Sequence, residues 1–437
     1  MQKIFVILSL LGMIVLASCQ FGSDKKDSEL AIRIKKDKKL EQVRQMAHDL
    51  VKTGFNAGTS YSEVWIRDYN TFIKVSCDVL PQYRVRENLL IFLKFQGADG
   101  NIIDGFIPRE KVGHVSYDYI YTDKAPEYAG HKNTVETDQE SSLVQAVSKY
   151  IEKTGDDSIL QEKVFGKTVL ERLQFAMEFL LTKRYSEKYG LIWGATTADW
   201  GDVQPEHEWG VVLDENSHLA IDIYDNAMFV IALNELIELI DKSGQKKKWI
   251  KIRDEVKTNI RKHLWDEKLN KFIPHVYLDA SPFPKDFDEN RLYYHGGTAV
   301  AIEADLLSKE EIARVNAWMV NNQKQANAQS IGLTICPPYP KGYFKNPSMY
   351  PYGYQNGGDW TWFGARMIQQ LVKYGFVKEA YQEIQPMVDR VLKNNGFFEW
   401  YTIDGRPTGA GDFRGSAGVL AEAIEMLKDW ADDRTQR

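Results

Sequence analysis

The feature that most constrains the fold is a series of twelve apolar stretches of helical length that follow one another in pairs. In each stretch, apolar residues recur at the spacing of one helix face. The predicted helices span residues 31–53, 69–80, 83–96, 138–154, 166–184, 220–242, 246–265, 298–307, 309–321, 360–374, 376–394 and 414–432. Strand signals are short and lie only in connections, at 190–193 and 271–276. The pattern predicts an all-α fold.

Every second predicted helix is introduced by a polar or glycine-rich cluster. The six clusters occupy residues 65–68, 136–138, 222–225, 294–298, 355–360 and 413–418. One such cluster alone would be explained by helix capping and turn formation. If the helices that follow the clusters line a barrel with their N-termini at one end, the other helices return outside and all the clusters meet at one mouth. The long connections 96–137 and 322–359 fit such a site, since long ordered loops usually carry function.

Charge and aromatic content narrow the class of ligand. The 55 Lys and Arg against 61 Asp and Glu give a net charge of −6, and the dense basic face of a nucleic-acid binder is therefore not expected. Trp, Tyr and Phe make up 12% of the chain, and several stand beside Gly, Asp and Asn in loops. Aromatic faces stack on sugar rings while carboxylates and amides bind hydroxyls, so this mixture favours a carbohydrate partner. The oligomeric state stays open.

The N-terminus predicts export. Gln2 and Lys3 precede an apolar run, 4–16, that is too short to span a bilayer as a helix. The small residues before Cys19 resemble a bacterial lipoprotein signal, with an ordinary secretory signal as the alternative. We expect a lipidated Cys19 that holds the protein to the cell envelope, on its periplasmic or surface side. The predicted divisions are a signal peptide over 1–18, a polar tether over 19–30 and one catalytic domain over 31–437.

Neither cysteines nor histidines indicate a cofactor. Cys77 and Cys336 lie too far apart in sequence for a disulfide framework, and they either pair or remain buried thiols. No two histidines have the close spacing of metal ligands, and the run from Glu206 to Glu208 around His207 is typical of a solvated loop. We expect no metal and no organic cofactor.

Two loop segments carry carboxylates among aromatic residues. Hydrolysis of a glycosidic bond needs an acid at the leaving oxygen and a second carboxylate that attacks or activates water. The first segment, 194–202, contains Asp199 and Asp202 on either side of Trp200-Gly201. The second contains Glu399, whose bulky neighbours predict partial desolvation and a raised pKa. One of the two aspartates is expected to be catalytic and the other to bind hydroxyls, and their spacing leaves the choice open.

These segments resemble the six-hairpin glycosidases, which share an (α/α)6 barrel and include glucoamylase, trehalase, processing α-glucosidase, neutral invertase and the glycogen-debranching glucosidases. The resemblance rests on Arg67-Asp68, on the run from Asp199 to Asp202, and on Phe398-Glu399-Trp400-Tyr401 with the glycines that follow. It implies a toroid of six helical hairpins with long active-site loops at one end. In these families the acid follows the fifth helix and the base follows the eleventh, which implies Asp202 as acid, Glu399 as base and an inverting mechanism.

The resemblance also implies binding residues. Sugar hydroxyls are assigned to Arg67, Asp68, Asp199, Asn356 and Asp359, and stacking walls to Trp65, Trp200, Trp360 and Trp400. The helix-introducing clusters add Glu136, Asp138, Gln355 and His295 as further candidates. The sequence differs from the trehalase type, whose acid stands in a Ser-Gly-Trp-Asp-like run. It is close to the Asp-Trp-Asn-Asp run of the phosphorylase members, with Gly201 in place of Asn.

The expected activity is hydrolysis of an oligo- or polysaccharide, first of all exo-hydrolysis of an α-glucoside. Phosphorolysis is disfavoured because phosphate and sugar phosphates are cytoplasmic. Two other classes stay open: a sugar epimerase or polysaccharide lyase on the same barrel, and a glycan-binding lipoprotein without catalysis. A lyase needs a basic subsite that the acidic chain does not suggest. A pure binder has no need of a paired acid and base.

Overall fold

The computed structural model describes residues 27–113, 118–241 and 243–435. The predicted signal peptide and Cys19 lie outside these ranges. Within them, no helix combines the length and the apolar character needed to cross a membrane.

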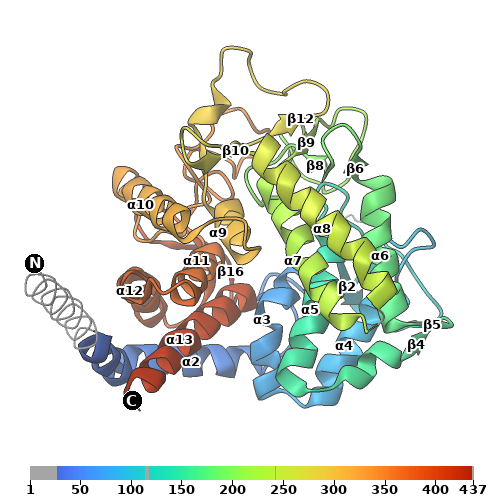
Figure 1. The fold of residues 1–437 in the computed structure, drawn as a ribbon, viewed down its shortest axis with the longest axis horizontal. Coiled ribbons are helices and arrows are strands. Elements are labelled where there is room, and N and C mark those ends of the chain that lie inside the picture. Colours follow the sequence, from blue (N-terminus) through green and yellow to red (C-terminus); the bar gives the residue numbers. More distant parts are fainter. Residues whose placement is uncertain (1–26, 114–117, 242, 436–437) are drawn as a thin grey trace, which may run out of the picture.

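An inner ring of helices surrounds the axis of the molecule (Figure 1). Each inner helix packs against the next, and α13 closes the ring by packing against α3. In chain order the ring consists of α3 (Ile66–Val79), α5 (Gln139–Thr154), α7 (Ile223–Leu239), α9 (His295–Glu303), α11 (Thr361–Lys373) and α13 (Arg414–Thr435). These are the helices that follow the polar clusters, as the sequence predicts.

An outer layer alternates with this ring along the chain. It consists of α2 (Lys38–Val51), α4 (Gln82–Lys94), α6 (Val169–Lys183), α8 (Ser243–His263), α10 (Lys309–Gln325) and α12 (Val377–Asn394). From α4 onward each outer helix packs on the inner helix before it, and α2 packs on α13, α3 and α12. The prediction of an all-α fold with an (α/α)6 toroid is confirmed.

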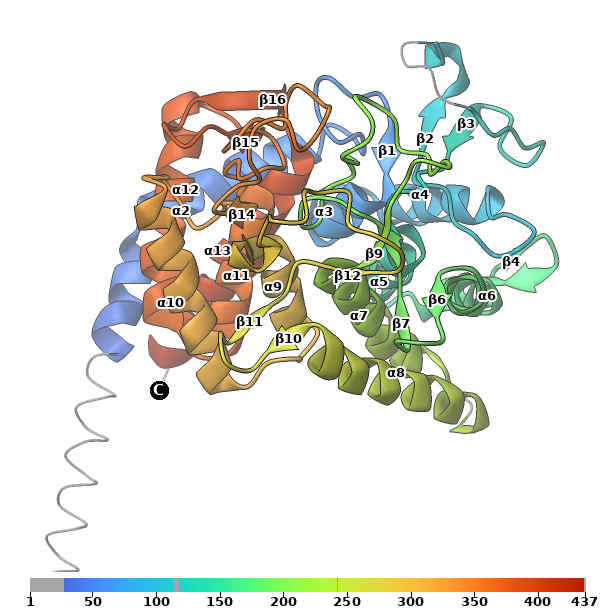
Figure 2. The ribbon, with the colours of Figure 1, turned by 90° about the horizontal axis from the view of Figure 1, so that it is seen from above.

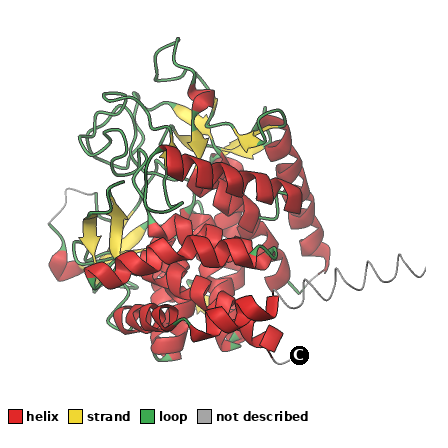
Figure 3. Ribbon diagram, turned by 90° about the vertical axis from the view of Figure 1, so that its left-hand side faces the viewer, coloured by secondary structure: helices red, strands yellow, loops and turns green. Residues whose placement is uncertain are grey.

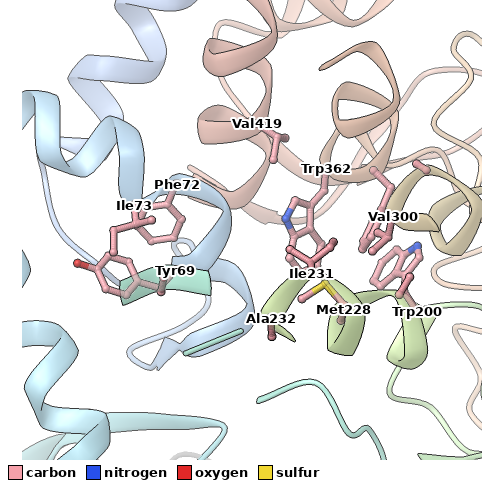
Figure 4. Packing of buried hydrophobic residues seen from close by; sticks show 14 of the residues in the cluster. Tyr69, Phe72, Ile73, Trp200, Met228, Ile231, Ala232, Val300, Trp362 and Val419 are labelled. Atoms are coloured by element: carbon pink, nitrogen blue, oxygen red, sulfur yellow. The ribbon is translucent and has the colours of Figure 1, made fainter. Parts of the chain in front are cut away.

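The inner helices are buried on nearly all sides because they touch both the ring and the outer layer. Figure 4 shows Trp362, Met228 and Val300 from three inner helices packed with Trp200. Close packing requires small residues in the ring. At Gly418 of α13, a Cβ atom would stand 2.3 Å from the Cβ of Phe72 in α3, so only glycine allows these two helices their observed separation.

Short antiparallel strands precede the inner helices and shape the mouth of the barrel. The main groups are β1 (Val64–Trp65), β2 (Gly105–Pro108) and β3 (Tyr128–His131); β8 (Gly194–Ala195), β9 (Leu219–Ile221) and β12 (Val276–Tyr277); β13 (Tyr293–Tyr294) with β14 (Ile335–Cys336); and β15 (Phe398–Tyr401) with β16 (Pro407–Gly411). Strands and long loops gather on one side of the helical body (Figure 3), and β1, β2, β15 and β16 share one edge of the molecule in Figure 2.

Minor strand pairs and single 3₁₀ turns fill the remaining connections. They are β4 (Lys163–Val164) with β5 (Lys167–Thr168), β6 (Tyr185–Ser186) with β7 (Leu191–Ile192), β10 (Trp265–Asp266) with β11 (Lys271–Phe272), and the turns η1 (Arg109–Lys111), η2 (Asp157–Gln161) and η3 (Glu289–Arg291). The predicted strand segments 190–193 and 271–276 contain β7 and β11.

Several predicted boundaries differ for local reasons. The helix predicted over 31–53 is interrupted at Asp37, whose carboxylate accepts a hydrogen bond from the Lys39 amide and caps α2. Residues 27–36 are helical before this break, so helix already begins within the segment predicted as a tether. Helix α9 begins at His295, three residues early, with its glycine pair inside the first turn.

Hydrogen bonds beside the mouth join a segment near the start of the described chain to a segment near its end. The Thr59 amide donates to the Gly411 carbonyl at 2.9 Å, and the Arg414 amide donates to the Ala57 carbonyl at 2.8 Å. The cysteines Cys77 and Cys336 are free thiols, the first half-buried and the second buried.

Candidate active site

A cavity of about 770 Å³ opens where the mouth loops meet. We call it the mouth cavity. The predicted site residues that line it are Trp65, Arg67, Asp68, Trp200, Asp202, Gln355, Trp360 and Glu399. The predicted residues outside its lining are Glu136, Asp138, Asp199, His295, Asn356, Asp359 and Trp400. Residues from both carboxylate segments therefore reach one space.

Glu399 is held on strand β15 with both carboxyl oxygens engaged. Oε2 accepts a hydrogen bond of 2.8 Å from the Ala410 amide of β16, and Oε1 accepts one of 3.1 Å from the Tyr61 hydroxyl. Burial raises the pKa of Glu399 to about 7; the negative charge of Asp202 acts in the same direction, and hydrogen bonds from Ala410, Tyr61 and Tyr354 act against it. Glu399 is thus poised to exchange a proton near neutral pH.

Asp202 enters the cavity from the loop between β8 and β9. Its Oδ1 accepts a hydrogen bond of 2.7 Å from Nε2 of Gln355, and its amide donates to the Oε1 of the same residue at 3.2 Å. A Cβ atom at Gly201 would stand 2.5 Å from the Gln355 Oε1 and 3.0 Å from the Ala198 carbonyl oxygen, so a side chain there would displace Gln355 from Asp202. Gln355, predicted to bind sugar, orients Asp202 at the cavity wall.

Asp199 is turned away from the cavity and is fully buried. Its two carboxyl oxygens accept hydrogen bonds from the amides of Gly296 and Gly297, at 2.7 and 2.8 Å. Those amides open α9, and a carboxylate there satisfies free N–H groups at the positive end of the helix dipole. A Cβ atom at Gly297 would stand 2.7 Å from the Asp199 carboxylate, and one at Gly296 would stand 2.2 Å from Cδ1 of Trp200, which explains the paired glycines.

We predict that Asp199→Ala lowers the free energy of unfolding by about 2 kcal/mol, because two buried amides lose their acceptor. Denaturant titration followed by circular dichroism measures this change. The matched variant Asp202→Ala, at a partly exposed position, is expected to change the free energy of unfolding by less than about 0.5 kcal/mol. Equal losses in the two variants would contradict the assignment of Asp199 to the fold.

Arg67 and Asp68 stand in the first turn of α3. The Nε of Arg67 lies 2.7 Å from Oδ2 of Asp138, its guanidinium also pairs with Glu136, and Nη1 donates to the Trp200 carbonyl at 3.2 Å. Glu136 and Asp138 therefore hold Arg67 in place. Asp68 differs, because its buried Oδ1 has no hydrogen-bond partner among the described residues and burial raises its pKa to about 8. Its carboxyl group is available to a ligand hydroxyl.

The other predicted residues outside the lining maintain the loop between α10 and α11. Both ring nitrogens of His295 are engaged, by the Ile331 carbonyl and the Asn322 side chain. Asn356 bonds to the backbone of Tyr339 and Met349. Asp359 pairs with Arg390 at 2.9 Å and accepts from the Ser330 hydroxyl at 2.6 Å. Trp400 is buried, with its ring centroid 6.2 Å from that of Tyr354.

Aromatic rings form much of the cavity wall. The ring centroids of Trp200 and Trp360 lie 4.6 Å apart at 82°, and Trp200 stacks on Phe363 at 4.3 Å. Trp65 meets His131 edge-on at 5.8 Å on another part of the wall. These walls offer apolar faces for the C–H surfaces of a sugar ring.

Several lining residues are absent from the sequence prediction. They include Tyr61, Asp104, His131, Trp209, Tyr354, Trp362 and Phe413. Asp104 stands directly before β2, and burial raises its pKa to about 7. Tyr61, Asp104, His131 and Trp209 lie in loops or short strands outside both the helix-introducing clusters and the two carboxylate segments from which the sequence signal came, whereas Tyr354, Trp362 and Phe413 lie in or next to those clusters. Within the described ranges, no group of three or more His, Cys, Asp or Glu is arranged to hold a metal ion.

Comparison with solved structures agrees with this architecture. The GH63 mannosylglycerate hydrolase from Thermus thermophilus in complex with glucose has a TM-score of 0.60 at 14% identity, over 88% of this chain and 99% of that one. The rhamnosidase from Klebsiella oxytoca with rhamnose bound has a TM-score of 0.57 at 13% identity, over 89% of this chain and 64% of that one. At such identities the likeness establishes the fold alone.

The family is established by sequence. No curated protein matches the chain. The family model described as the glycosyl hydrolase 94 superfamily, catalytic domain, matches residues 39–388, which is most of the chain and includes Arg67, Asp68 and Asp202. Together with the helical toroid and the carboxylate-lined mouth cavity, this match identifies the chain as a glycosidase of the glycosyl hydrolase 94 superfamily.

Proposed function

We propose that this protein is an inverting glycoside hydrolase in which Asp202 is the general acid and Glu399 the general base. The observation that carries the proposal is that these two carboxylates reach the mouth cavity from separate segments, a loop and strand β15, while the charge of Asp202 raises the pKa of Glu399. An acid and a base on opposite sides of a glycosidic bond are what inversion requires, with carboxyl groups about 6.5–9.5 Å apart.

In the proposed reaction, Asp202 gives its proton to the glycosidic oxygen as the bond from that oxygen to the anomeric carbon breaks. Water attacks the anomeric carbon from the opposite face, and Glu399 takes a proton from the water. Gln355 holds one oxygen of Asp202 and leaves the other for the proton transfer. Arg67, Asp68 and the tryptophan walls would bind the sugar whose anomeric carbon reacts.

The charge of the mouth cavity supports water, rather than phosphate, as the nucleophile. The acids of the wall include Asp68, Asp104, Asp202, Glu208 and Glu399. The basic side chains that line it, within the described residues, are Arg67, His131, Lys132 and His207.

Each of these bases is already engaged or uncharged. Arg67 pairs with Glu136 and Asp138, and Lys132 lies 2.9 Å from Glu140. The Nε2 of His207 lies 3.4 Å from Asp214. Burial lowers the pKa of His131 to about 4, so its ring is neutral at pH 7. A phosphate dianion would find no spare positive charge in this wall.

We further propose exo-action on an α-glucoside, guided by the sequence resemblance to glucoamylase and the α-glucosidases. The fold relative from Thermus thermophilus is a mannosylglycerate hydrolase and has been crystallised with glucose. That enzyme suggests a second candidate, a glycoside of glycerate. The engagement of the basic side chains that line the cavity, within the described residues, disfavours it, because the carboxylate of glycerate would find no free positive partner.

The direct test is proton NMR of fresh product from a panel of α- and β-linked gluco- and manno-oligosaccharides, with and without phosphate. We expect release of a free sugar whose anomeric configuration is opposite to that of the substrate, at a rate independent of phosphate. Retention would overturn the mechanism, and a sugar phosphate would overturn hydrolysis. Glycan binding without turnover, unchanged in Glu399→Gln, would favour the non-catalytic alternative.

The pH dependence separates base from acid. If Glu399 must be deprotonated to act, kcat/KM rises with pH through a midpoint near its pKa of about 7. Tyr61→Phe removes a donor that lowers this pKa, so the midpoint should move to higher pH. Tyr121→Phe, at an exposed tyrosine outside the cavity lining, is the control and should leave the midpoint in place. Activity that falls with pH through 7 would instead make Glu399 the acid.

We also propose that Cys19 carries a lipid anchor at the cell envelope. The support is the signal-like sequence before it. The intact protein should fractionate with membranes, and Cys19→Ser should release it. Release of neither form, or of both, would contradict the anchor.

A further inference from the structure

A tryptophan on the cavity rim is highly exposed, yet hydrogen bonds hold the backbone on both sides of it. Trp209 lines the mouth cavity, yet 68% of its surface is accessible. It lies in residues 203–213, which we call the rim loop. Single exposed apolar residues are common on proteins, so the argument depends on where this ring stands and what holds it.

The rim loop is fastened on both sides of Trp209. On one side, the Asn346 side chain donates to the Glu208 carbonyl at 2.5 Å, and the Lys345 amide donates to the Pro205 carbonyl at 3.1 Å. On the other, the Thr134 amide donates to the Val211 carbonyl, and the Thr134 hydroxyl accepts from the Leu213 amide, both at 2.8 Å. Neighbouring loops thus fix the backbone that presents the ring.

The rim loop begins directly after Asp202, and both Asp202 and Trp209 line the mouth cavity, so the two side chains belong to one continuous segment of its wall. A general acid stands beside the leaving group, because it protonates the oxygen that departs with it. Arg67 and Asp68 are buried in the wall, whereas Trp209 is on the rim. A substrate whose reacting sugar lies between Asp68 and Glu399 therefore extends its leaving group toward Trp209.

We propose that Trp209 is the stacking platform for a neutral sugar ring on the leaving-group side, so that the substrate is an oligosaccharide and not the glycoside of a small anion. The inference rests on the proposed function and narrows it. Two observations carry it: the supported, exposed aromatic face beside the acid, and a wall in which the described basic groups are already engaged or neutral. The side chain of Glu208, the residue before Trp209, also lines the cavity and supplies a carboxylate for hydroxyls of the stacked sugar.

The test compares three substrates of the same reacting sugar: the best neutral disaccharide of the panel, the glycosyl fluoride and the glycoside of glycerate. Trp209→Ala should lower the ratio of kcat/KM for the disaccharide to kcat/KM for the fluoride by about tenfold, since only the disaccharide has a ring to stack. Trp209→Phe should restore most of this ratio. Trp318→Ala, at an exposed tryptophan outside the lining, is the matched control and should leave it unchanged.

The glycerate glycoside should react at least about tenfold less efficiently than the disaccharide with the wild-type protein. An unchanged ratio in Trp209→Ala, or a preference for the glycerate glycoside, would overturn the inference while leaving hydrolysis intact. Absence of turnover on all three would refute the proposed function instead. Calorimetric titration with neutral trisaccharides then decides the inference: weaker binding by Trp209→Ala supports it, and equal binding overturns it.

Discussion

Glu399→Gln is expected to lower kcat/KM by about 10⁴-fold, on the glycosyl fluoride as well as on glycosides, because water loses the group that takes its proton. The amide keeps the size of the side chain and can still accept from Tyr61 or Ala410. The fold should therefore survive, and far-ultraviolet circular dichroism checks this point. Initial rates over a range of substrate concentrations measure the loss.

The chain offers a matched control for this variant. Glu383 on α12 is also largely buried, burial raises its pKa to about 7, and its Oε1 accepts from Asn316 at 2.9 Å. Glu383→Gln makes the same chemical change outside the mouth cavity and should leave kcat/KM within about twofold of the wild type. Activity of Glu399→Gln within tenfold of the wild type would remove Glu399 from the base role.

The loss of activity in Asp202→Asn is expected to depend on whether the leaving group needs a proton, as it should if Asp202 is the general acid. On glycosides, whose leaving oxygen must be protonated, kcat/KM should fall by about 10³-fold. On the glycosyl fluoride, whose fluoride ion departs without needing a proton, kcat/KM should fall by less than about tenfold. The Oδ1 of the asparagine can still accept from Nε2 of Gln355, and the backbone amide of residue 202 keeps its bond to the Gln355 Oε1, so the loop should retain its position.

The opposite pattern would exchange the roles of the two carboxylates. If Asp202→Asn lost activity on both the glycosides and the glycosyl fluoride, while Glu399→Gln kept activity on the fluoride, Glu399 would be the acid. The raised pKa of Glu399 makes this comparison necessary, because a carboxyl that titrates near pH 7 can serve in either role.

The fold was largely predictable because helix periodicity and glycine-rich starts repeat along the whole chain. The choice between Asp199 and Asp202 was not, since both flank Trp200-Gly201 in the same short run. It depends on contacts with distant residues: the amides of α9 engage Asp199, and Gln355 engages Asp202. Sequence spacing carries no record of those partners.

Some of the predicted binding residues line the cavity and others hold the fold, and the sequence could not separate the two groups because their partners are distant in the chain. A polar cluster at a helix start marks the mouth, but it serves the helix cap and the loops as well as a ligand. His295, Asn356 and Asp359 have internal partners that satisfy their side chains. Conversely, Asp104 and Trp209 reach the cavity from within long loops, where no periodic pattern points to either residue.

If Glu399 is the base, as proposed, the contact between the first and last parts of the described chain makes activity depend on both. Glu399 is oriented by Tyr61, near the start of the described chain, and by Ala410, near its end. The stretches that hold these residues are joined by the bonds from Thr59 to Gly411 and from Arg414 to Ala57. A nascent chain that still lacks α13 cannot form the bond from Arg414 to Ala57, so we expect it to lack the proposed activity until that helix has been made.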